Sequence, residues 1–200
     1  VEDYVAVAAR CEGLKGLSAI ELNVSCPNVS AGGWAFGNSI PVSAGLLAEV
    51  KKIFHGPVWV KLPPEAPDLP GLARALEAGG AEAVVVANTY RAMAWDWRKN
   101  ASRLAPLAGG LSGPAIRPLS LRRVYEVSRA VAIPVIASGG VAGGEDVLEY
   151  LSAGAAAVEL GTVNFVRPRA GEEVAEETAR LWRERRPGEG AALASRLGWA

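Results

Sequence analysis

The sequence predicts an α/β protein in which a parallel sheet is covered by helices. Short apolar runs, rich in Val, Ile, Leu and Ala, alternate with longer stretches of helical periodicity. Strands that read as continuously apolar are buried on both faces, which is typical of parallel sheets connected by helices. Five strands are expected, at residues 19–24, 58–62, 83–87, 134–137 and 156–160, and residues 83–87 form a continuous run of this kind.

The segments between these strands carry the spacing and the end signals of helices. Residues 42–54 place four apolar side chains at helical spacing: Leu46, Leu47, Val50 and Ile53. Asp68 is suited to cap a helix over residues 69–77, which the glycines at 79 and 80 would end. Ser120 is expected to cap a helix that runs to residue 130. Further helices are expected at residues 1–14, 145–152 and 170–186.

One connection is unusually long. Residues 90–118 are expected to form a loop, which holds the bulky segment Trp95-Asp96-Trp97. Loops of this length without secondary structure are uncommon in compact domains and are usually functional. We therefore expect this loop to have a role beyond connecting two elements.

The end of the first strand, residues 21–28, reads ELNVSCPN and brings a thiol close to two amides. Pro27 must end a central strand, because it has no N–H and a fixed φ. Asn23 and Asn28 can then flank Cys26, where they would offer donor and acceptor edges to a polar heterocycle and the thiol could move a proton. A free cysteine is also commonly an inert core residue, so these eight residues alone leave both interpretations open.

Notable polar residues follow the carboxyl ends of all five strands. These residues are Asn23, Cys26, Lys61, Asn88, Ser138 and Thr162. The carboxyl ends of the strands form the active-site face of a (β/α) barrel. The last two strands end in Gly139-Gly140 and Gly161-Thr162, whose backbone N–H groups could cradle a phosphate, as they do after strands seven and eight of such barrels.

This position of the glycines predicts a (β/α)8 TIM barrel, of which the chain would cover about strands 4 to 8. We expect residues 1–200 to form a single barrel domain that lacks its N-terminal third. The chain begins at Val1, and its single methionine is Met93. A complete barrel of this type is typically about 250 residues long.

Composition narrows the class of protein. The chain has 21 basic and 21 acidic side chains, a balance that argues against a nucleic-acid binder. No apolar run reaches the roughly 18 residues of a membrane span. The two cysteines have no metal-binding spacing, and one histidine is too few for a His-based zinc cluster or a Ser-His-Asp triad of the usual kind. We expect a protein of the reducing cytoplasm.

At this point the residues resemble a known family, dihydroorotate dehydrogenase. The matching segments occur in the family's order and read IELNVSCPNV, VKLPP, ANT, GGLSGPAIRPLSLRRVYEV, ASGGV, GGEDVLEYLSAGA and LGTVNF. Cysteine at position 26 is similar to class 1, since the membrane-associated class has serine there. The GGLSGPAIRPLSLR and AFG segments resemble the NAD-linked subgroup.

The resemblance implies an FMN enzyme that oxidises dihydroorotate to orotate in pyrimidine biosynthesis. Cys26 would be the general base that takes a proton from C5, while a hydride passes from C6 to N5 of FMN. The residues implied to hold the pyrimidine are Asn23, Asn28, Asn88 and Thr89. Lys61 would stabilise the reduced flavin. Gly139, Gly140, Gly161 and Thr162 are implied to bind the FMN phosphate, with Gly113 in the loop near it, and Ser138 is a further implied cofactor-binding residue.

The NAD-linked subgroup also implies a partner. Its FMN subunit pairs with a second subunit that carries FAD and a 2Fe–2S cluster, with a homodimer of FMN subunits inside a heterotetramer. Cys11 and Cys26 alone could not hold such a cluster in this chain.

Two other interpretations stay open. The NxSCP core is shared with FMN reductases of the dihydropyrimidine dehydrogenase type, although the ANT segment and the loop after Asn28 favour dihydroorotate. A non-catalytic flavin-binding module is the other, against which Cys26 and its flanking asparagines argue. The Trp95-Asp96-Trp97 segment is bulkier than the family pattern, which leaves open an altered pocket or a partner surface.

Overall fold

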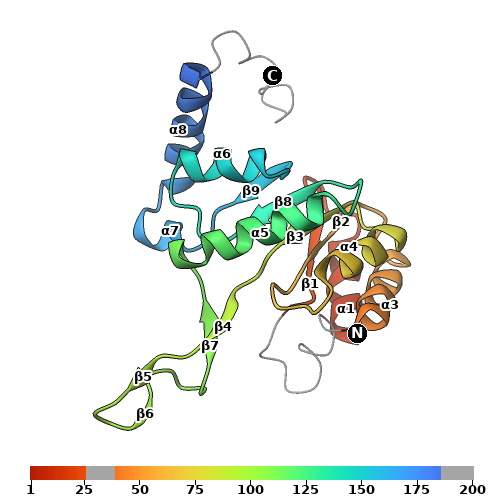
Figure 1. Ribbon diagram of the computed structural model, residues 1–200. Helices are drawn as coiled ribbons and strands as arrows, with labels where there is room; N and C mark the ends of the chain where they lie inside the picture. Colours follow the sequence, from red (N-terminus) through yellow and green to blue (C-terminus); the bar gives the residue numbers. More distant parts are fainter. Residues whose placement is uncertain (26–38, 186–200) are drawn as a thin grey trace.

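The computed structural model describes residues 1–25 and 39–185, and its centre is a five-stranded parallel sheet. The strands follow one another in the order β1-β2-β3-β8-β9 (Figure 1). They span Ile20–Asn23, Val58–Lys61, Ala83–Val86, Val135–Ser138 and Ala157–Glu159. All neighbouring pairs are parallel, as in β1 and β2, where Ile20 pairs with Val58. The predicted parallel α/β sheet is confirmed, with strand ends within about two residues of those expected from the sequence.

The described helices other than the short α7 form one layer against the sheet, and α7 contacts α8. The helices span Glu2–Cys11 (α1), Ile40–Lys51 (α3), Leu69–Ala78 (α4), Arg117–Ser128 (α5), Gly144–Ser152 (α6), Val163–Val166 (α7) and Ala170–Arg185 (α8). Figure 1 shows them lined up along the sheet, from α1 and α3 at one end to α8 at the other. Within the described ranges, no helix is long and apolar enough to cross a membrane.

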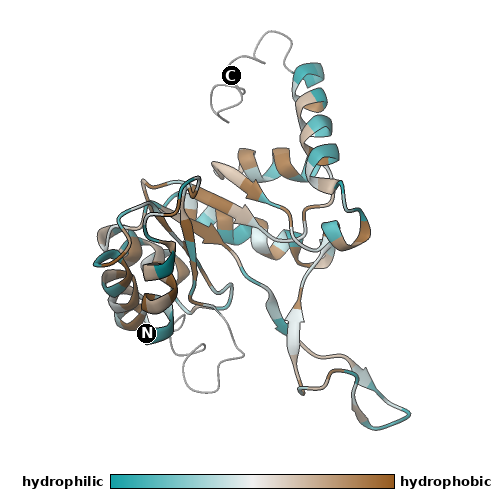
Figure 2. Ribbon diagram, turned by 180° about the vertical axis from the view of Figure 1, so that it is seen from behind, coloured by the Kyte–Doolittle hydropathy of each residue, from teal (hydrophilic) through white to brown (hydrophobic). Residues whose placement is uncertain are grey.

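Each strand has an outer face that packs on the helices and an inner face that does not. Leu22, Val60 and Val84 belong to the large core shared with the helices. Their neighbours along the strands alternate onto the other face, where Trp59 and Val85 contribute to a smaller cluster. This alternation follows from the period of two in a strand. The strand ribbons in Figure 2 are accordingly mostly hydrophobic, whereas the helices alternate between hydrophobic and hydrophilic residues.

The sheet is strongly curved. Lys61 on β2 and Glu159 on β9 form an ion pair of 2.7 Å, although β3 and β8 lie between these strands. Neighbouring strands are about 4.8 Å apart, so β2 and β9 would be about 14 Å apart in a flat sheet, with side chains perpendicular to it. The two side chains can meet only on the concave face of a curved sheet.

The structure confirms one predicted helix cap, corrects two helix predictions and adds a helix that was not predicted. Asp68 caps α4 as expected, since its Oδ1 accepts a hydrogen bond of 2.8 Å from the Gly71 N–H. Ser120, however, is not a cap: α5 begins at Arg117, and Ser120 is buried inside it. The physical reason is Pro118, whose missing N–H and fixed φ suit the first turn of a helix. Helix α1 ends at Cys11 rather than residue 14, before Gly13 with its φ of +74°, and the short α7 was not predicted.

The predicted loop at residues 90–118 was also wrong, because most of it is a β arm. Strand β4 (Tyr90–Ala92) pairs antiparallel with β7 (Gly109–Leu111), and β5 (Trp95–Asp96) pairs with β6 (Ala101–Ser102). The arm projects from the body in both ribbon views (Figures 1 and 2). A short 3₁₀ helix, η1 (Pro114–Ile116), then leads into α5. Strands of two or three residues are too short for a period of two to be recognised.

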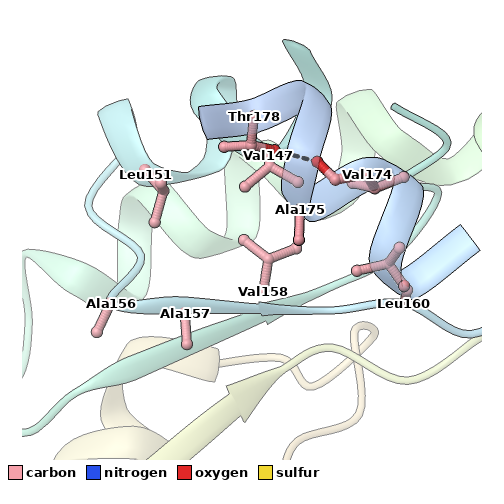
Figure 3. A pocket seen from close by; sticks show the side chains of 10 residues that line it. Val147, Leu151, Ala156, Ala157, Val158, Leu160, Val174, Ala175 and Thr178 are labelled. Carbon is pink, nitrogen blue, oxygen red and sulfur yellow. Dashed lines mark hydrogen bonds between the residues drawn. The ribbon is translucent and has the colours of Figure 1, made fainter. Parts of the chain in front are cut away.

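One end of the sheet leaves an apolar hollow. It lies between β9, α6 and α8, has a volume of about 290 Å³, and is lined by side chains such as Val147, Val158 and Val174 (Figure 3). In the described part of the chain, β1 and β9 each pair with a neighbour on one side only. Open strand edges beside apolar surface recruit other chains.

We therefore expect residues 1–200, produced alone, to self-associate. The exposed edges of β1 and β9 and the hollow beside β9 would be covered by other copies in solution. Light scattering of the purified chain should show particles well above the mass of one chain, 20.8 kDa. A monodisperse monomer would contradict this prediction and show that these edges are protected.

Candidate functional site

The carboxyl ends of the strands meet at a cavity of about 170 Å³. Its lining comes from the ends of β2, β3, β8 and β9 and from the segment before α5, which is where parallel strands bring their carboxyl ends together. The lining residues are Lys61, Ala87, Asn88, Thr89, Ser112, Gly113, Ile116, Ser138, Gly139, Gly140, Gly161 and Thr162. Nine of the residues singled out from the sequence are in this set.

Glycines form one wall of the cavity, and at two positions the backbone requires them. Gly140 has a φ of +75°, and a Cβ there would lie 2.8 Å from the Gly113 carbonyl oxygen and 2.9 Å from the Arg117 nitrogen. Gly139 has a φ of +142°, and its Cβ would lie 2.4 Å from Ser120 Oγ. Glycine at both positions therefore lets this stretch of backbone pack closely against the residues that lead into α5. Bare backbone of this kind is suited to hold a phosphate.

Buried Tyr150 supports the glycine turn from behind. It lies on α6 with a relative exposure of 0%, and its hydroxyl donates a hydrogen bond of 2.6 Å to the Gly139 carbonyl. Burial raises the pKa of Tyr150 to about 12, so the hydroxyl keeps its proton at physiological pH. Across the cavity, Thr162 Oγ1 donates to Ser112 Oγ at 2.8 Å and joins two segments that are distant in the chain. The sequence carried no signal for the role of Tyr150.

Lys61 is held between two carboxylates on the concave face. Its Nζ lies 2.7 Å from Glu159 Oε2 and 3.3 Å from Glu21 Oε1. The Lys61, Glu21 and Glu159 side chains are 18%, 27% and 31% exposed. The backbone of Glu21 lies at the open edge of β1, so its side chain is better covered than the residue as a whole.

The surroundings shift the pKa values of Glu21 and Lys61. Burial raises the pKa of Glu21 to about 7, the neighbouring Glu159 carboxylate adds to the rise, and Lys61 partly opposes it. Burial alone would lower the pKa of Lys61, but hydrogen bonding and attraction from Glu159 and Glu21 hold it above its ordinary value. Sequence reasoning missed both glutamates. The available signal was an acidic residue within each of two short predicted strands.

The amide groups predicted for substrate binding also meet. Asn23 Oδ1 accepts hydrogen bonds from Asn88 Nδ2 at 3.1 Å and from Ser25 Oγ at 2.6 Å. Asn88 Nδ2 also donates to Ser25 Oγ, and Asn88 Oδ1 accepts from the Thr89 N–H at 2.7 Å. The Tyr4 hydroxyl fixes the backbone by donating to the Asn23 carbonyl at 2.6 Å. Ser25 and Tyr4 were not predicted.

Two predicted residues, Cys26 and Asn28, lie outside the described residues. Among the residues that are described, no group of three or more His, Cys, Asp or Glu side chains could hold a metal ion. What remains is a site that offers glycine backbone, the partly buried ammonium of Lys61 and a set of linked amides. This combination suits a phosphate-bearing, polar heterocycle.

The comparison with protein families supplies the decisive observation. The family model described as dihydroorotate dehydrogenase matches residues 1–181. The chain belongs to the dihydroorotate dehydrogenase family. The family model extends over the whole described sheet and all the strand ends that line the cavity.

Curated relatives of the dihydroorotate dehydrogenase family agree in their names. The chain is 48% identical over 177 residues to "Dihydroorotate dehydrogenase B (NAD(+)), catalytic subunit" of Bacillus pumilus, a match that covers 88% of this chain and 57% of the relative. A protein of the same name from Solidesulfovibrio magneticus is 46% identical, with 92% of this chain and 60% of the relative covered. A third, from Malacoplasma penetrans, is 46% identical over 84% of this chain and 55% of the relative. The chain therefore spans 55% to 60% of the length of these three relatives.

Proposed function

We propose that the protein is the FMN-binding catalytic subunit of a dihydroorotate dehydrogenase, which oxidises dihydroorotate to orotate in pyrimidine biosynthesis. One observation carries the proposal: the strand ends of a chain in this family bring Lys61, Asn88 and the Gly139-Gly140 turn into one cavity. Relatives named for this activity support it.

The residues present fit FMN. The Gly139-Gly140 turn, Gly161 and Thr162 would hold the phosphate end, because they line the same cavity and offer backbone N–H groups there. Gly113 and Ser138 line the same wall, and Lys61 would lie beside the ring system. When bound, FMN supplies the acceptor for a hydride.

The chain's own residues would hold the substrate and move its proton. Asn23, Asn88 and Thr89, with Asn28, would bind the amide and carboxylate edges of the pyrimidine. The linked amides already hold one another in place through Ser25. Cys26 would take the proton from C5 as general base, the usual role of a group that can be deprotonated next to a substrate C–H bond.

We also propose that the sheet is part of a (β/α)8 barrel, with β1, β2, β3, β8 and β9 as about strands 4 to 8. The curvature that joins Lys61 to Glu159 supports this, because a closed barrel requires curvature of this kind. The longer relatives leave room for the remaining strands. The domain would be a single FMN-binding barrel.

A partner subunit completes the proposal. The relatives' names contain "NAD(+)" and "catalytic subunit", which supports a separate subunit for electron transfer. We propose that this partner carries FAD and a 2Fe–2S cluster, and that two FMN subunits pair within a cytoplasmic heterotetramer.

The activity can be tested on the complete gene product. Purified under air and loaded with FMN, it should reduce an artificial acceptor when dihydroorotate is added, and dihydroorotate should bleach the flavin absorbance without oxygen. Dihydrouracil serves as the matched control substrate and should give little turnover. Preference for dihydrouracil would favour the dihydropyrimidine dehydrogenase type, and no turnover with either would favour a non-catalytic flavin module.

The choice of electron acceptor tests the proposed partner subunit independently of dihydroorotate oxidation. The FMN subunit alone should reduce the artificial acceptor but not NAD, because neither FAD nor an iron–sulfur cluster is available to carry electrons out of the site. Adding an iron–sulfur flavin subunit from the same organism should restore NAD reduction. Efficient NAD reduction by the iron-free FMN subunit would contradict the proposed partner while leaving the proposed activity intact.

A further inference from the structure

We propose that Glu21 and Glu159 are positioning residues that fix the Lys61 ammonium at the wall of the cavity and moderate the charge it presents to the flavin. The inference rests on the proposed function, because it concerns a flavin in this cavity. It adds two acidic residues that lie outside the set implied by the family resemblance.

Two contacts hold the Lys61 ammonium in place. Lys61 lies at the end of β2 and lines the cavity, while its Nζ contacts Glu159 on β9 at 2.7 Å and Glu21 on β1 at 3.3 Å. A lysine has a flexible four-carbon stem, so one contact would leave its position poorly defined. Two carboxylates that approach from opposite ends of the described sheet restrict it to one place.

The cluster of Lys61, Glu21 and Glu159 holds more acidic than basic groups. One ammonium faces two carboxylates, so the cluster has a net charge of −1 when all three groups are ionised and 0 when one carboxyl is protonated. The strands between them present Val85, Ile136 and Ser138 to this face, none of which titrates near neutral pH. A negative cluster would oppose the electrons that a flavin takes up, and a neutral one would not.

The charge of this cluster depends on pH. The pKa of Glu21 is about 7, so the charge of the cluster changes within the physiological range. The same protonation is a stability effect. Because the folded pKa of Glu21 lies above its ordinary 4.5, its proton stabilises the fold fully below about pH 4.5, and this contribution is lost as pH rises through about 7.

The main test is the flavin reduction potential of the complete FMN-loaded protein at pH 8. Glu21→Gln and Glu159→Gln should each favour the reduced flavin, and the double variant should shift the ratio of reduced to oxidised flavin at least about tenfold, or about 30 mV for a two-electron couple. Lys61→Met should shift the ratio in the opposite direction. At pH 6, Glu21→Gln should match the wild type, because Glu21 already carries a proton there.

Glu82→Gln is the matched control. Glu82 also forms an ion pair with a lysine, Lys51, at 2.5 Å, but neither residue lines the cavity. Its removal should leave the potential unchanged. An unchanged potential in the double variant with FMN bound would overturn the inference, whereas absence of dihydroorotate turnover in the wild type would overturn the proposed function.

A second measurement does not depend on bound flavin, so it can also be made on variants that bind FMN poorly. The melting temperature of the complete protein should be compared between pH 5 and pH 8 for the wild type and Glu21→Gln. As the pH rises from 5 to 8, the wild type should lose the stability that the Glu21 proton contributes. The Glu21→Gln variant should not lose it, because glutamine does not titrate. Equal pH dependence of the two proteins would show that Glu21 does not titrate beside Lys61, which would also overturn the inference.

Discussion

Replacing Cys26 with alanine in the complete enzyme should slow reduction of the flavin by dihydroorotate about 10²–10⁴-fold, the usual contribution of a general base. FMN should stay bound, because the proposed cofactor contacts come from Lys61 and the glycine wall rather than from this thiol. Stopped-flow absorbance without oxygen measures the step directly.

The pH profile of the same step provides an independent check on Cys26. An ordinary thiol has a pKa of about 8.5, so roughly 3% is thiolate at pH 7. The wild-type rate should therefore rise with pH through the mildly alkaline range, and Cys26→Ala should lose that rise. Cys11→Ala is the matched control, since Cys11 lies on α1 and packs against the core away from the cavity. A near-native rate in Cys26→Ala would show that another group takes the proton.

The sequence was sufficient to predict the sheet, because short runs rich in Val, Ile, Leu and Ala alternate with segments of helical periodicity. All four residues of β3, from Ala83 to Val86, are buried, and such a run has few alternatives in a chain that alternates strands with helices. The residues at the strand ends followed from the same pattern. Once the strands are parallel, Asn88, Ser138 and Thr162 must share one edge of the sheet.

Contacts that depend on curvature could not be predicted in this way. Lys61 and Glu159 are 98 residues apart, and they meet only because the sheet bends. Local pattern gives the face of each side chain but not the shape of the sheet. The prediction that Ser120 caps α5 was wrong for a different reason. Serine suits a cap, but Pro118 allowed the helix to begin earlier. The β arm was not predicted because its strand pairs, such as Arg91 with Gly110, join distant residues in very short strands.

Gly140→Ala should abolish stable FMN binding and destabilise the fold. The residue has a φ of +75°, and the new Cβ would meet backbone atoms of Gly113 and Arg117 at 2.8 and 2.9 Å, which cannot move aside as a side chain can. Backbone strain and overpacking together should lower the free energy of unfolding by roughly 2–5 kcal/mol. FMN affinity should fall about 100-fold or more, equivalent to the loss of two charge-assisted hydrogen bonds of about 1.5 kcal/mol each. Flavin fluorescence titration and thermal melts measure the two effects.

Two alanine variants separate strain from loss of space. Gly45→Ala lies on the exposed side of α3, where a Cβ meets nothing within 4 Å, so it should bind FMN normally and gain up to about 1 kcal/mol of stability. Gly161→Ala also meets nothing within 4 Å, but it lines the cavity. It should therefore keep native stability and bind FMN more weakly, because the added methyl occupies space that the phosphate needs. If Gly140→Ala binds FMN with native affinity, the glycine wall of this cavity does not hold the phosphate.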